Sequence, residues 1–213
     1  MHASALLDDR TVALLRAAAA TAGGKEPAIR RALTAAIDAG TPPEWVEELL
    51  LQSILMVGYP RALIAFGIWR AVSGRPAPAT DADAEYAMVS TWEQRGEATC
   101  GAVYGANYSK LRSNVRALHP AVDRWMLVEG YGRTLGRAGL DLMRRELCTV
   151  VQTAVLRTPR QMHSHLRGAL NGGATVAQVE QALALVTPEL DPAERAELAR
   201  LWSAVRAGWM EAG

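Results

Sequence analysis

Cysteine is scarce in this sequence: the 213 residues include only Cys100 and Cys148. The two lie far apart and form neither a C-x-x-C pair nor a metal-ligand spacing, so we expect no disulfide framework and no metal site. Two free thiols are typical of a reducing compartment, and the N-terminus lacks the basic-then-apolar pattern of a signal peptide. The sequence therefore predicts a cytoplasmic protein.

The sequence also has almost no net charge and no long uninterrupted apolar stretch. The formal net charge is +1, which gives no reason to expect a nucleic-acid partner. The longest apolar stretch, residues 49–65, is interrupted by Gln52, Gly58 and Arg61, so we expect no membrane span. Half of the residues are apolar and 21% are charged, which is typical of a globular protein with a packed core.

Alternation of apolar and polar residues with a period of two is also absent, and helix signals dominate instead. Caps, first-turn prolines and terminal glycines predict an all-α fold. The expected helices are 9–22, 26–38, 41–55, 59–72, 81–94, 120–135, 141–156, 159–170, 175–185 and 192–209. Residues 74–80 have the composition of a linker, and residues 96–108 show no clear pattern.

The sequence repeats itself at a spacing of 133 positions. Helix stops, caps and apolar positions recur in one order without an insertion, as in the pairs Leu33/Leu166, Gly40/Gly173, Glu47/Glu180 and Trp69/Trp202. Chance similarity between Ala- and Leu-rich helices is the alternative. A duplication predicts tandem helical hairpin units, with a first copy at 1–73, a linker at 74–80 and a second copy at 81–213.

Three ordered segments carry a family resemblance. They are Tyr131-Gly-Arg-Thr-Leu-Gly-Arg-Ala-Gly-Leu-Asp141, Arg144-Arg-Glu-Leu147 and His163-Ser-His-Leu-Arg-Gly-Ala-Leu-Asn-Gly-Gly173. Together they resemble the carboxymuconolactone decarboxylase family over residues 120–186, and the resemblance returns at 29–70. It implies a helical bundle of the alkylhydroperoxidase D-like type, no cofactor, and a homo-oligomer such as a trimer of two-copy chains.

The resemblance also suggests roles for individual residues. Loss of carbon dioxide from a carboxylated lactone leaves a dienolate-like anion, which needs a hydrogen-bond donor and a general acid. Histidine titrates near neutral pH, so His165 is the expected acid, with Glu146 as its partner. The expected substrate-binding residues are Arg133, Tyr131, Arg137 and His163.

Two other functions remain open. The alkylhydroperoxidase D-like peroxidases share the Glu and His positions, but their two cysteines correspond here to Thr158 and Gln161. A peroxidase would need Cys148 to be exposed and to have a low pKa. A catalytically silent, oligomeric ligand-binding protein is the third possibility, because a lone histidine is more often structural than catalytic. An open pocket lined by His165 would favour an enzyme.

The first copy lacks the two residues of the expected site, and helix geometry sets the distance between them in the second copy. Glu146 and His165 correspond to Ala13 and Ala32, so the first copy is expected to be structural. If helices 141–156 and 159–170 form a hairpin, Glu146 lies opposite residue 170, about one turn from His165. Direct contact would then require a bend or a bridging water.

Overall fold

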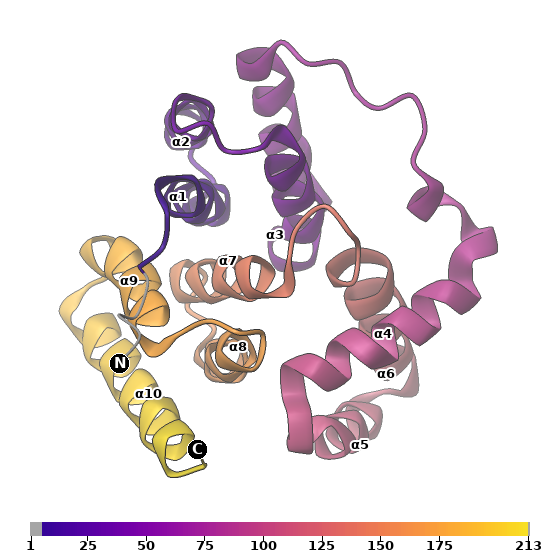
Figure 1. Cartoon of the computed structure of the whole chain (residues 1–213), viewed down its shortest axis with the longest axis vertical. Helices are drawn as coiled ribbons and strands as arrows, with labels where there is room; N and C mark the ends of the chain where they lie inside the picture. The colour runs from indigo at the N-terminus through magenta and orange to yellow at the C-terminus, as the bar shows by residue number, and fades with distance from the viewer. Residues whose placement is uncertain (1–5, 213) are drawn as a thin grey trace.

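The computed structural model describes residues 6–212, and within this range the chain forms helices and no β-strand (Figure 1). The first copy contains α1 (Asp9–Gly23), α2 (Glu26–Asp38) and α3 (Pro43–Ser73). The second ends with α7 (Leu142–Val155), α8 (Pro159–Asn171), α9 (Val176–Val186), the 3₁₀ turn η5 (Thr187–Glu189) and α10 (Pro192–Ala212). The prediction of an all-α fold is confirmed.

Between these two groups lies a third group of helices. It contains the 3₁₀ turns η1 (Ala82–Ala84), η2 (Tyr86–Met88) and η3 (Gly105–Asn107), then α4 (Val89–Tyr104), α5 (Tyr108–Leu118), α6 (Pro120–Trp125) and the π-helix η4 (Met126–Leu135). The expected helix at 81–94 is wrong in its first half, because the Asp81 side chain accepts a hydrogen bond from the Asp83 backbone and caps a 3₁₀ turn. The stretch 96–108, which showed no pattern, is mostly helical.

The helices of the two copies match in position. Adding 133 to the bounds of α2 gives 159–171, the bounds of α8, and adding it to Pro43 gives the first residue of α9. Equivalent contacts recur: Trp69 Nε1 donates to Glu47 Oε1 at 2.8 Å, and Trp202 Nε1 donates to Glu180 Oε1 at 3.2 Å. These observations support the proposed duplication, whose boundaries stay a prediction.

Both copies share one hydrophobic core. Buried residues of α1, α2 and α3 join those of α7, α8, α9 and α10 in a single cluster, with α7 near the centre of the view in Figure 1. By length and hydropathy α3 could span a membrane. However, Leu49, Leu50 and Trp69 of this helix lie in the shared core, and its helical dihedral angles are interrupted at Gly58.

A smaller core joins α4 to η4. It contains Cys100, Val103, Leu127, Tyr131 and Leu135. The two helices approach so closely that a Cβ added at Gly132 would overlap the backbone oxygen of Trp92. The helix expected at 120–135 accordingly widens into a π-helix from Met126 onward, and this places Tyr131 beside α4.

Candidate active site

His165 of α8 and Glu146 of α7 are in direct contact. His165 Nδ1 lies 2.8 Å from Glu146 Oε2, and both residues are buried. The expectation that contact would need a bend or a bridging water is therefore wrong. Burial strengthens the electrostatic interaction of such a pair when the ring is protonated, because water no longer screens it.

Gly168 makes this contact possible. A Cβ at this position would overlap Glu146 Oε2 and would lie 2.8 Å from Val103 Cγ1 of α4. The carboxylate thus occupies the space of the missing side chain, and from there it extends along α8 to His165, nearly one turn earlier. Gly168 is therefore a positioning residue for the pair.

The second oxygen of Glu146, Oε1, is buried and has no hydrogen-bond partner among the described residues. Buried polar atoms are nearly always paired, so an unpaired carboxylate oxygen stands out as a functional candidate. Glu146 also acts on two tyrosines, whose hydroxyl oxygens lie 3.2 Å apart: Tyr104 and Tyr131. Burial, with a further contribution from the Glu146 charge, raises the pKa of Tyr104 to about 12 and that of Tyr131 well above its usual value.

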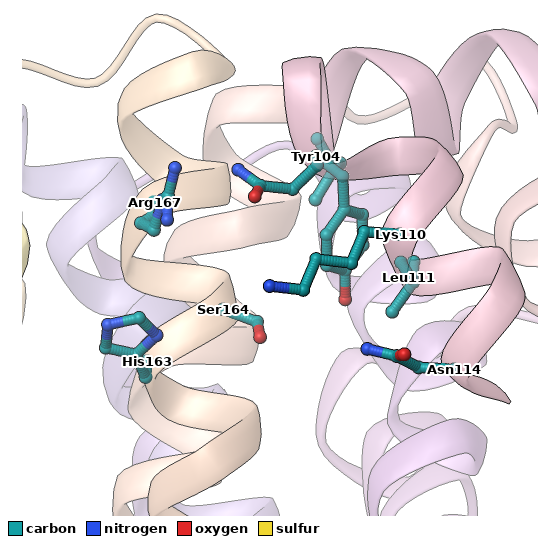
Figure 2. A pocket seen from close by; sticks show the side chains of 9 residues that line it. Tyr104, Lys110, Leu111, Asn114, His163, Ser164 and Arg167 are labelled. Atoms are coloured by element: carbon teal, nitrogen blue, oxygen red, sulfur yellow. The ribbon is translucent and has the colours of Figure 1, made fainter. Parts of the chain in front are cut away.

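A cavity of about 180 Å³ lies between α8 and the α4–α5 region (Figure 2). Tyr104 and Lys110 project into this space from one side, and His163 and Ser164 lie on α8 opposite them. The complete lining is Val103, Tyr104, Asn107, Lys110, Leu111, Asn114, His163, Ser164 and Arg167, and it contains no acidic residue. A site with cationic and amide groups and no carboxylate is suited to a small anion.

The two histidines of α8 take different positions. His163 lines the cavity, whereas His165 lines none of the five main cavities of the described residues. Tyr104 connects the two places, because it lines the cavity and lies near Glu146. The charge of Glu146 therefore acts on one residue of the cavity lining, the Tyr104 phenol.

The two arginines expected to bind substrate lie elsewhere. Arg133 pairs with Glu129 at 3.0 Å and stacks over the ring of Trp92, 5.1 Å from its centroid. Arg137 pairs with Glu48 at 3.0 Å and with Asp81 at 2.9 Å. Both line a separate groove, together with the exposed Tyr59 and Trp125 of α3 and α6.

Sequence reasoning did not single out Tyr104 or Lys110. Both lie in or beside the stretch that showed no helix pattern, and only the packing of α4 and α5 against α8 brings them to the cavity. The rarity of lysine could have drawn attention to Lys110, because the sequence contains only two lysines. In the described chain neither Arg167 nor Lys110 forms an ion pair.

Both thiols are unsuited to peroxide chemistry. Cys100 and Cys148 are buried, and burial raises the pKa of Cys100 to about 12 and that of Cys148 further. A thiol peroxidase needs a thiolate that peroxide can reach. Within residues 6–212, no group of three or more His, Cys, Asp and Glu side chains is placed to hold a metal ion.

The raised pKa of Tyr104 predicts a loss of stability at alkaline pH. Tyrosine in an unfolded chain ionises near pH 10, whereas Tyr104 in the folded chain keeps its proton up to about pH 12. A raised folded-state pKa contributes stability that is complete below about pH 10 and is lost as pH rises toward 12. We expect the free energy of unfolding, measured with urea, to fall over this interval by roughly 2 kcal/mol less in Tyr104→Phe than in the wild type. Equal losses in both proteins would contradict the assignment.

Two stretches of the chain match one known protein family. The sequence pattern of the carboxymuconolactone decarboxylase family matches residues 2–71 and again residues 120–203. The second match contains α7 and α8 with Glu146 and His165. No curated protein matches the chain significantly. Because the two matched segments make up well over half of the sequence, the chain belongs to the carboxymuconolactone decarboxylase family.

Proposed function

We propose that the protein is a cofactor-free lyase that removes carbon dioxide from a small carboxylated lactone or a related acid by proton transfer. The observation that carries this proposal is the buried His165–Glu146 pair, with its unpaired carboxylate oxygen, near Tyr104, which lines a cationic cavity. A titratable group with a shifted pKa beside a cavity, here Tyr104, is typical of acid–base sites.

The cavity supports an acidic substrate. Its volume of about 180 Å³ is close to that of the ~150 Å³ cavity known to hold benzene, so a single small ring fits. Lys110 and Arg167 have no carboxylate partner in the described chain and are free to bind the substrate's carboxylate. Asn107, Asn114 and Ser164 offer further hydrogen bonds to ring oxygens.

The proposed reaction breaks one carbon–carbon bond. The bond to the carboxylate cleaves, carbon dioxide leaves, and the electron pair remains on the substrate as a dienolate. Tyr104, which its raised pKa keeps protonated at neutral pH, donates to the dienolate and then gives its proton to carbon. For the His165–Glu146 pair to restore the proton of Tyr104, Glu146 Oε1, which has no partner in the described chain, must accept a hydrogen bond from the Tyr104 hydroxyl when substrate is bound. Solvent then supplies the proton that the pair has given up. The net change is the replacement of a carboxylate by a proton.

The test is carbon dioxide release from 4-carboxymuconolactone by the wild type and by single variants. We expect His165→Gln and Tyr104→Phe each to lower kcat by about 10²–10⁴-fold, which is the usual contribution of a general acid. Lys110→Met should mainly raise KM, because Lys110 binds the carboxylate in both ground and transition states.

His163→Gln is the matched control, since it changes the same residue type on the same helix. In the proposed mechanism it affects KM more than kcat. If His163→Gln abolished turnover while His165→Gln preserved it, the proton would come from the cavity histidine and the role given to His165 would be wrong. A folded wild type without turnover would overturn the decarboxylase proposal.

One observation favours a second function, a catalytically silent ligand-binding protein. His165 lines none of the five main cavities of the described residues, so its pair with Glu146 is also compatible with a structural role. In that case the lactone would bind with an affinity that depends on Lys110, and carbon dioxide would not be released. A thiol peroxidase is not supported, because both cysteines are buried.

We also propose that the chain forms a cytoplasmic homo-oligomer, as its family resemblance implies. Large apolar side chains remain exposed on neighbouring parts of α3 and α6, including Tyr59, Leu63 and Trp125, each more than 60% exposed. Apolar surface of this kind is typical of subunit contacts.

A further inference from the structure

The first copy contains a hollow of about 410 Å³ beside the position that corresponds to His165. Helices α1 and α2 form most of it, and Val155 of α7 and Leu185 of α9 complete it. Ala32, which lines the hollow, is the counterpart of His165 at the spacing of 133. The same face of the helical hairpin thus holds an ionisable pair in the second copy and open space in the first.

A packing difference explains why the hollow is open. In the second copy α4 covers this face, and Val103 reaches the space beside Gly168. The counterpart of Gly168 is Ala35, which lines the hollow. Within the described residues, no helix covers α2 in the way that α4 covers α8.

The charges around the hollow point to an anion. Arg16, Lys25 and Arg31 line it and form no ion pair or hydrogen bond through their side chains within the described chain, and Glu189 is the one acidic residue of the lining. The rest of the lining is alanine, glycine, valine and leucine. The lining thus carries a net positive charge above an apolar floor, at a volume within the usual range for ligand pockets.

We propose that this hollow binds a small organic anion with an apolar body, at a site separate from that of the proposed reaction. The carboxylate of such a ligand would pair with Arg16 and Arg31, and its ring or chain would cover the alanines. The first copy would then have lost the acid–base pair and kept a binding function.

The test is titration calorimetry of the full chain with benzoate, carried out in the Lys110→Met background so that the cavity beside α8 contributes little. We expect saturable binding that weakens about tenfold when Arg16 and Arg31 are both changed to glutamine, because each partly exposed charge pair contributes up to about one kcal/mol. Ala32→Leu should weaken binding, because its three added carbon atoms occupy part of the hollow beside α2. Benzamide, which has the same ring without the charge, should bind about as weakly as benzoate binds the double arginine variant.

Two results would overturn the proposal. One is the absence of saturable benzoate binding in the Lys110→Met background. The other is binding that both the arginine pair and Ala32→Leu leave unchanged. Because Arg16 and Arg31 are exposed, their variants keep the test valid even if Ala32→Leu fails to fold. The readout is binding, so its failure is distinguishable from a failure of the proposed turnover.

Discussion

Replacing Glu48 by leucine is expected to lower the free energy of unfolding by about 3–5 kcal/mol, the usual cost of leaving a buried charge without its partner. Glu48 Oε2 accepts a hydrogen bond from Arg145 Nη2 at 2.7 Å, and the Arg145 side chain is completely buried. Burial lowers the pKa of Arg145, which indicates how costly its charge would be without the carboxylate. The remaining acceptors of Arg145 are neutral: the carbonyl oxygens of Arg137 and Leu140 and the side chain of Gln52.

The double variant Glu48→Leu/Arg145→Met separates this cause from a general packing defect. It removes both charges, and we expect it to recover much of the loss, since apolar residues of similar volume often replace a buried ion pair at little cost. Urea denaturation followed by circular dichroism measures both changes. Glu197→Leu is the control, because it removes a solvent-exposed pair with Arg200. If Glu48→Leu were no more destabilising than Glu197→Leu, the buried network would not stabilise the junction of the copies.

Gly132→Ala is expected to destabilise the protein by about 3 kcal/mol, at the upper end of overpacking effects. The new Cβ would overlap the Trp92 backbone oxygen and would lie 2.6 Å from the Trp92 carbonyl carbon. A backbone cannot move aside as a flexible side chain can, so α4 and η4 would have to separate. Gly96→Ala should act similarly, because its Cβ would overlap the Leu127 oxygen.

Gly101→Ala is the matched control on the same helix. No atom lies within 4 Å of a Cβ added at Gly101, so the higher helix propensity of alanine should stabilise α4 by up to about 1 kcal/mol. Thermal unfolding of the three variants would show opposite signs for Gly101→Ala and for the other two. Similar melting temperatures for Gly96→Ala and Gly101→Ala would mean that the contact between α4 and η4 is looser than described.

The helices within residues 9–38 and 141–212 could be predicted because their signals are local. Asp141 caps α7 through the Arg144 backbone, and Thr175 and Gln178 form a capping box at α9; both motifs can be read from consecutive residues. The segment 81–135 was predicted less well. Its packing depends on Gly96 and Gly132, whose role is to admit another backbone, and a single sequence does not show which backbone will approach.

The candidate site likewise has residues that the sequence predicted and residues that only tertiary packing brings together. Family resemblance led to Glu146 and His165, but the hairpin geometry alone placed them a turn apart, because the space left by Gly168 depends on α8 and α4 together. Arg133 and Arg137 were expected at the site from residue type, whereas in the structure each is already paired with a carboxylate from its surroundings. Which cations stay unpaired depends on the positions of all the acidic residues, and these are set by tertiary packing.

By itself, then, the sequence determined the helical class, the approximate helix bounds within residues 9–38 and 141–212, the 133-residue spacing and the loss of the His–Glu pair from the first copy. These depend on residue types and on interactions over a few positions, which the chain order records directly. Only the tertiary structure decided that Tyr104 and Lys110 meet α8, that His163 and not His165 lines the cavity, and that α4 covers one copy and leaves the other open. Those features arise from contacts between segments tens of residues apart, where close packing of backbones and side chains selects the neighbours.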